Sequence, residues 1–275
     1  MAKPTPVRGL NAASPMPQAA RAFLGSRVAD VQRHLGKLGP NLGADEVHDA
    51  RVATRRLRAA LGLFGNRKRV RKADKVISAL QDALGDVRDL QVQLDAFAAL
   101  GEKADPLERT ALRHVRQHLQ ARLPDRTDAL RAAIPRWQKD GLQALGRLEQ
   151  LEPPGKLGGH RLRERLISDL EELEACLLEA HRDPSASPMH ELRKAVKRYR
   201  YSLELLEPAM PAEVEEILGA LVPLQDPLGT LHDTDVRLEL VDDHGDASTK
   251  GTDAILRRLR SDRDRQAQEV LRALE

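Results

Sequence analysis

One pattern occurs twice in the sequence, as VHDARVATRRLRAAL at residues 47–61 and as MHELRKAVKRYRYSL at residues 189–203. Apolar residues recur in both stretches at spacings of three and four, the period of an amphipathic helix. An offset of 142 positions superimposes the polar residues, with His48 on His190, Arg51 on Arg193, Arg55 on Lys197, Arg56 on Arg198 and Arg58 on Arg200. Each stretch therefore predicts a helix with a basic face, and we call these two sets of residues the basic ladders.

The similarity extends on both sides of the ladders. The same offset places Leu24, Val28, Val31 and Leu35 on Leu166, Leu170, Leu173 and Leu177. An offset of 144 places LQDALGDVRD at residues 80–89 on LQDPLGTLHD at residues 224–233, so that Arg88 corresponds to His232. These matches predict an internal repeat of two helical halves, with two residues inserted between the motifs of the second half.

The composition predicts an all-α fold, because Leu, Ala, Arg and Glu dominate and β-branched and aromatic residues are sparse. Glycine and proline divide the pattern into helices predicted over 17–38, 44–64, 67–84, 87–100, 106–122, 126–150, 160–181, 188–207, 211–222, 232–242 and 252–274. Proline and glycine cluster at residues 153–159, where we place the join between the halves. We expect a flexible tail over residues 1–16, a first bundle over 17–152 and a second bundle over 160–275.

Composition also narrows the class of protein. The single cysteine, Cys176, excludes an internal disulfide, and no apolar run is long enough to span a bilayer, so we expect a cytoplasmic protein. Charged residues make up 32% of the chain but the net charge is only +3, so a site for an anion requires local segregation of charge. Aromatic residues make up 2%, which argues against base stacking and leaves only non-specific contacts with nucleic acid.

The ladder residues share one side of each predicted helix. At about 100° per residue, Arg51, Arg55 and Arg58 lie within about 80° of His48, opposite the apolar stripe, and Arg56 lies at its border. Lys194 and Tyr201 fall near the centre of the second basic face. Such a face is either solvated and paired with acids of neighbouring helices, or it binds a ligand with several negative charges. Its occurrence twice, with histidine at the same point, favours the ligand.

Two details leave alternatives open. Residues 66–75 extend the basic field of the first half, whereas the counterpart at 211–216 is acidic, so we expect an asymmetric site. His48 and His190 either contact the ligand or orient a neighbouring side chain, and protonation would add positive charge to the ladders in acid.

The twofold H-x-x-R-x-x-x-[R/K]-R-x-R helix, each copy followed by L-Q-D-x-L-G-x-x-[R/H]-D, resembles the CHAD domain, an α-helical family named for its histidine. The resemblance covers roughly residues 17–275 and implies two four-helix bundles related by a pseudo-two-fold, together forming one domain. It further implies a basic groove or pore that binds inorganic polyphosphate, often at polyphosphate granules. The residues implied as polyphosphate ligands are His48, Arg51, Arg55, Arg56, Arg58, Arg88, His190, Arg193, Lys194, Lys197, Arg198 and Arg200. The sequence departs from the pattern at His232, which stands where the first half has Arg88.

We expect a binding protein without catalytic residues, metal ligands or cofactor. The alternative is a metal-dependent phosphohydrolase of the HD type, since His48-Asp49 and His232-Asp233 are HD pairs. Neighbouring residues on a helix lie about 100° apart, however, which keeps His48 and Asp49 from sharing one metal. His114 and His118 are one turn apart, but the flanking Arg113 and Arg116 would repel a cation.

Overall fold

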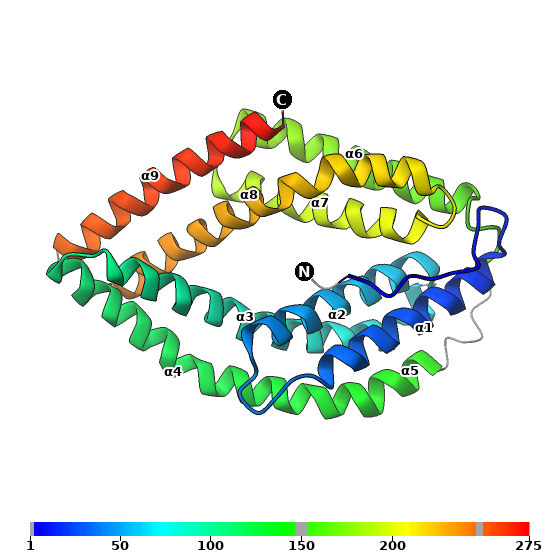
Figure 1. Cartoon of the computed structure of the whole chain (residues 1–275), viewed down its shortest axis with the longest axis horizontal. Coiled ribbons are helices and arrows are strands. Elements are labelled where there is room, and N and C mark those ends of the chain that lie inside the picture. Colours follow the sequence, from blue (N-terminus) through cyan, green and yellow to red (C-terminus); the bar gives the residue numbers. More distant parts are fainter. Residues whose placement is uncertain (1–2, 66, 147–152, 246–249, 275) are drawn as a thin grey trace. The chain divides into compact units, whose positions relative to one another are not determined.

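The structure is a computed structural model that describes residues 3–65, 67–146, 153–245 and 250–274. It is all-α as predicted, with no strand among those residues, and Figure 1 shows the order of the helices. The helices are α1 (Met16–Leu35), α2 (Ala44–Phe64), α3 (Arg67–Glu102), α4 (Pro106–Arg136), α5 (Leu142–Gly146), α6 (His160–Arg182), α7 (Ala186–Leu206), α8 (Pro211–His244) and α9 (Lys250–Ala273). No described helix combines the length and the apolar character needed to cross a membrane.

The lengths of the helices are consistent with the internal repeat. The described parts of α1 to α4 contain 20, 21, 36 and 31 residues, and those of α6 to α9 contain 23, 21, 34 and 24. In both series the second helix carries a basic ladder and the third carries L-Q-D-x-L-G. The structure therefore agrees with the predicted class of two sets of four long helices.

Three breaks predicted from glycine and proline were wrong. Helix α3 continues through Gly85, α4 continues through Pro124, and α8 contains both Pro223 and Pro227. A proline inside a helix removes one hydrogen bond and costs about 3 kcal/mol, which packing along a helix of more than 30 residues can offset. The predicted helix 126–150 instead passes through a π turn at Trp137–Gly141, and its residues 147–150 lie outside the described ones.

The chain forms two compact units. Unit 1 contains residues 1–88, 125–171 and 198–218, and unit 2 contains residues 89–124, 172–197 and 219–275. Several long helices thus contribute to both units, which the sequence pattern did not indicate. The predicted division into residues 17–152 and 160–275 describes the repeat and stays a prediction.

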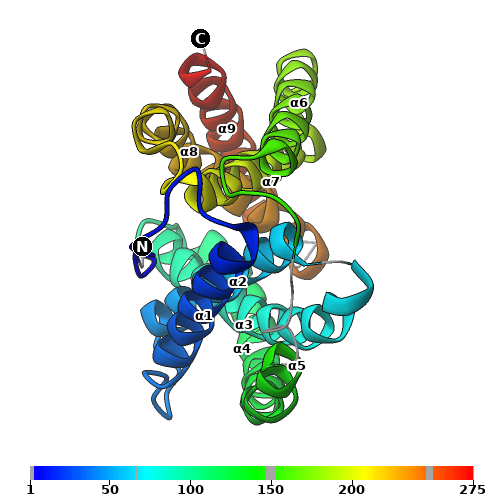
Figure 2. The same ribbon diagram turned by 90° about the vertical axis from the view of Figure 1, so that its right-hand side faces the viewer.

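In unit 1, α1 packs along α2, as the two views in Figures 1 and 2 show. The rings of Phe23 and Phe64 stack between these helices with centroids 5.7 Å apart. Trp137 is fully buried, and a β-carbon at position 141 would overlap its ring, so Gly141 makes room for the indole in the π turn.

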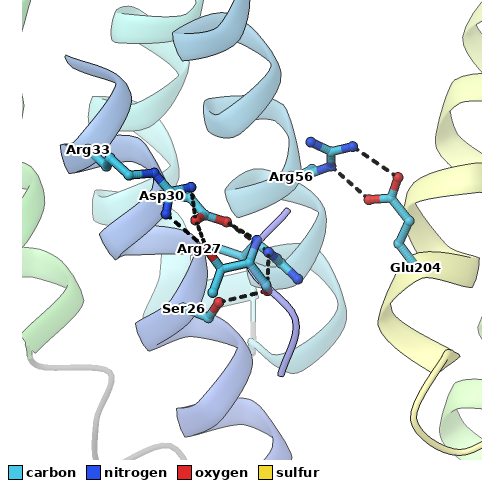
Figure 3. A network of polar contacts seen from close by, with 7 residues as sticks. Ser26, Arg27, Asp30, Arg33, Arg56 and Glu204 are labelled. Carbon is cyan, nitrogen blue, oxygen red and sulfur yellow. Dashed lines mark hydrogen bonds and ion pairs between the residues drawn. The ribbon is translucent and has the colours of Figure 1, made fainter. Parts of the chain in front are cut away.

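The segment before α1, expected to be flexible, makes specific contacts in unit 1. The backbone N–H of Thr5 donates to Asp30 Oδ2 at 3.0 Å, and the Thr5 hydroxyl donates to Oδ1 at 2.6 Å. The carboxylate of Asp30, which is 3% exposed, also accepts from Arg27 and Arg33. Figure 3 shows this network, which holds the N-terminal segment against α1.

Unit 2 has its own apolar core, built from parts of α3, α4, α8 and α9. Its buried members are Leu90, Phe97, Ala104, Ala111, Leu112, Val115, Leu119, Val241, Ile255, Leu256 and Leu259. Their spacing follows the helical period, so each helix turns its apolar stripe inward and its charged residues toward solvent.

Candidate functional site

The first basic ladder lies on α2 within unit 1, where α3 supports it. Arg88 of α3 donates from Nη1 to the carbonyl oxygen of Ala44 at 3.2 Å, which brings its guanidinium to the start of α2. One turn earlier on α3, a β-carbon at Gly85 would lie 3.2 Å from Nε of Arg51. The missing side chain of Gly85 leaves room for the Arg51 guanidinium, so the L-Q-D-x-L-G motif and the ladder form one arrangement.

The surroundings of His48 are cationic. Burial lowers the pKa of His48, and the nearby guanidinium groups of Arg88 and Arg55 lower that pKa further. Asp49 opposes them weakly, and its carboxylate lies 4.0 Å from the imidazole of His34 on α1. His48 is therefore neutral at pH 7 and lies among side chains that attract an anion.

The start of the second ladder lies in unit 2, where His190 meets His232 of α8. Their Nδ1 atoms are 3.2 Å apart and their ring centroids 4.6 Å apart. His232 corresponds in the repeat to Arg88, so both copies bring the equivalent residue of the third helix to the ladder histidine. Burial, followed by Lys194 and Arg193, lowers the pKa of His190.

A carboxyl group also lies near the second ladder. Burial raises the pKa of Asp233, whereas Arg193 and Arg237 act in the opposite direction, which places both cations close to this carboxyl. The backbone carbonyl of Asp233 accepts a hydrogen bond from Gln93 Nε2 at 3.4 Å. Arg237 was missed in the sequence because its counterpart in the first half is the uncharged Gln93, so the repeat gave no signal there.

The far ends of the ladders are paired with acids inside unit 1. Arg56 donates from Nε and Nη2 to Glu204 at 2.8 and 3.2 Å, as Figure 3 shows, and Nε of Arg200 lies 3.5 Å from the same carboxylate. Arg58 donates to Asp74 at 2.9 Å. Pairing with neighbouring acids, one of the two explanations of a basic face, thus describes these three arginines, and their assignment as ligands stays a prediction.

The remaining ladder residues are placed as follows. Arg193, Lys197 and Arg198 are half-buried, whereas Lys194 is exposed and pairs with Glu191 at 2.7 Å. Tyr201, expected near the centre of the basic face, is only 7% exposed, and the guanidinium of Arg200 lies over its ring. Packing in unit 1 covers this part of α7, so Tyr201 is not exposed on the basic face. The side chains of residues 66–69 lie outside the described ones.

One of the two histidines considered as a metal pair, His118, has another partner. The ring of His118 stacks on His244 of α8 with centroids 3.6 Å apart. Within the described part of the chain, no three His, Cys, Asp or Glu side chains are grouped so as to hold a metal ion.

Comparison with known proteins identifies the family. The model of the CHAD domain matches residues 22–242 of this sequence. The chain belongs to the CHAD domain family. No curated protein matches it.

Solved structures show the same fold. The crystal structure of the CHAD domain from the plant Ricinus communis aligns with a TM-score of 0.76 and 21% identity, covering 100% of this chain and 96% of that one. PptA from Streptomyces chartreusis aligns with a TM-score of 0.66 and 14% identity, covering 94% of this chain and 98% of the other. At these identities the likeness concerns the CHAD fold alone.

Proposed function

We propose that this CHAD domain binds inorganic polyphosphate through its two basic ladders and does not hydrolyse it. The observation that carries the proposal is the cationic surroundings of both ladder histidines. Burial and then Arg88 and Arg55 lower the pKa of His48, and burial and then Lys194 and Arg193 lower that of His190. His48 and His190 thus occupy equivalent positions in the repeat, and each lies in a positive local field.

The shape of the ladders suits a linear polyanion. From His48 to Arg58 a helix rises about 15 Å, which presents basic groups at successive levels along one side. Guanidinium groups donate paired hydrogen bonds to phosphate oxygens, and each phosphate of a polyphosphate chain carries negative charge. We assign the main contacts to Arg55 and Arg88, whose charges act on His48, and to Arg51, which lies against Gly85. In unit 2 we assign them to Arg193 and Lys197, whose charges act on His190.

Binding is tested by titrating the protein with long-chain polyphosphate, triphosphate, orthophosphate and duplex DNA at two salt concentrations. We expect the tightest binding for long-chain polyphosphate. Its affinity should fall steeply as salt increases, because binding releases the counterions held by the polyanion and this release is less favourable at high salt. Reversal of charge in R51E/R55E, or in R193E/K197E, should weaken binding by at least about tenfold, since charge-assisted contacts are lost and repulsion is added.

The matched control is R257E/R258E, which changes the net charge equally on exposed positions of α9. If this control weakens binding as much as the ladder variants do, only overall charge matters and the proposal is wrong. Equal affinity for duplex DNA would favour a general polyanion binder instead.

Phosphate release is measured in the same samples with Mg²⁺ or Mn²⁺. We expect none above background. Release that follows enzyme concentration and disappears in D233N would establish the HD-type phosphohydrolase. Colocalisation with polyphosphate granules, which the proposed binding would allow, is tested by imaging the wild type beside R51E/R55E.

A further inference from the structure

Helix α6 carries an exposed apolar face. Ile167, Leu170 and Leu178 are 57%, 37% and 62% exposed, and they provide three of the five exposed large apolar side chains among the described residues. At about 100° per residue they lie within an arc of about 80°, whose centre is about 110° around the helix from the buried Leu162 and Leu173. Apolar side chains grouped in this way on a surface mark an interaction site.

The repeat provides an internal control for this face. The offset of 142 places Ile167 on Gly25 of α1 and Leu178 on Gly36, the residue after α1, whereas Leu170 falls on Val28. The first copy of the fold thus has no side chain at either glycine, and Gly25 instead lines a pocket with Leu142 and Leu145 of α5. Because the fold does not require bulk at the positions of Ile167 and Leu178, these two side chains need an explanation outside the chain's own packing.

The exposed charges of α6 are segregated along its length. The first half carries Arg161, Arg163 and Arg165, and the second half carries Glu171, Glu172, Glu174 and Glu179. The exceptions are Glu164 in the first half and Arg182 at the end. Two copies of α6 packed in parallel would place like charges together, whereas antiparallel packing places each basic half beside an acidic half. The face is therefore complementary to itself.

A register for this contact follows from heptad spacing. Residues 160, 163, 167, 170, 174, 177 and 181 alternate at spacings of three and four, as the core positions of a coiled coil do. With a two-fold axis between Ser168 and Asp169, Arg163 lies opposite Glu174 of a second copy, and Ile167 lies opposite Leu170 of that copy. Because the contact has two-fold symmetry, each of these pairs occurs twice in the dimer.

We propose that α6 is a homodimer interface, in which two copies of this chain pack their α6 helices antiparallel, with Arg163 against Glu174 and Ile167 against Leu170. This interface uses none of the residues assigned to polyphosphate, so it stands or falls independently of the proposed function.

The test is analytical ultracentrifugation of the full chain, without polyphosphate, over a series of concentrations. We expect the wild type to dimerise and the variant I167Q/L170Q to remain monomeric. Each charge reversal, R163E or E174R, should raise the dimer dissociation constant by about tenfold, because each changes two symmetry-related contacts. The double variant R163E/E174R should restore dimerisation, because it exchanges the two charges of the pair.

The control is V222Q, which removes a comparably exposed apolar side chain from α8 and should leave dimerisation unchanged. Circular dichroism and thermal unfolding check that every variant is folded. A wild type that is monomeric up to about 0.5 mM would overturn the proposal, since such weak association is below that of a specific interface. Failure of the charge exchange to restore a dimer that the single reversals disrupt would overturn the antiparallel register.

Discussion

The surroundings of His48 and His190 show how one sequence pattern can be supported in two ways. Around His48, Arg88 adds a permanent positive charge and Gly85 makes room for Arg51. Around His190, the residue equivalent to Arg88 is His232, whose charge depends on pH. Gly229 is equivalent to Gly85, but nothing lies within 4 Å of a β-carbon built at this position. The repeat thus preserves the ladder while the supporting helix varies, so the two copies should respond differently to the same change.

The last arginine of each ladder forms an ion pair, and the two ion pairs differ in their exposure to solvent. Arg200 pairs with Glu204, and their side chains are 6% and 16% exposed, whereas Arg58 pairs with Asp74 at 33% and 44% exposure. Glu204 also holds Arg56. Removing one partner of a mostly buried ion pair therefore destabilises the fold far more than removing one partner of an exposed pair.

We therefore expect the substitution E204A to lower the free energy of unfolding by about 3 kcal/mol or more, because it leaves two buried guanidinium groups without their carboxylate. The matched substitution D74A should change it by less than about 1 kcal/mol. Urea denaturation followed by circular dichroism measures both. Equal effects would mean that the two ends of the ladders are equivalent after all.

The second prediction concerns pH. Burial and cations keep the pKa values of His48 and His190 below 6.5 in the free protein, and a bound polyanion would raise them, so binding takes up protons. Affinity for polyphosphate should rise as pH falls below about 6.5, by up to about tenfold per pH unit for each proton taken up. Calorimetric titrations between pH 5 and 8 measure this dependence.

The variant H232R sharpens the comparison, because it gives the second copy the arginine of the first. We expect it to reduce the contribution of the second ladder to the pH dependence, while H48A removes that of the first. An affinity that does not change between about pH 7 and 5 would show that neither histidine is close to the ligand. The stability of the free protein should move the other way and fall below about pH 6.5, because the unfolded chain binds more protons at these histidines.

The smallest expected effect is at the glycines of L-Q-D-x-L-G. Alanine inside a helix is favoured over glycine by about 0.5–1 kcal/mol, so G229A should stabilise unit 2 without changing polyphosphate affinity. In G85A the new β-carbon would displace the Arg51 guanidinium, and we expect affinity to fall by about twofold to fivefold. Fluorescence titrations of the two variants in parallel would reveal whether Arg51 depends on this contact, and equal affinities would show that it does not.

Much of the fold followed from the repeated pattern. The helical period predicted α2 and α7 almost to the residue. The offset of 144 paired Arg88 with His232, each of which lies beside the first turns of a ladder helix. Helix ends that depend on proline were less predictable, because Pro223 and Pro227 remain inside α8. A local propensity of a few kcal/mol is overridden when a long apolar stripe is buried.

The sequence by itself determined the all-α class, the position of the ladders and the histidine at the start of each, because these depend on residue type and on the period of a helix. Only the tertiary structure placed Arg56 beside Glu204 and Arg58 beside Asp74. Glu204 is 148 positions from Arg56, and Asp74 is 16 from Arg58, so the period of one helix relates neither of these two pairs, although Glu204 is also one turn from Arg200. Pairing across helices is a property of packing, and the period of a single helix does not report it.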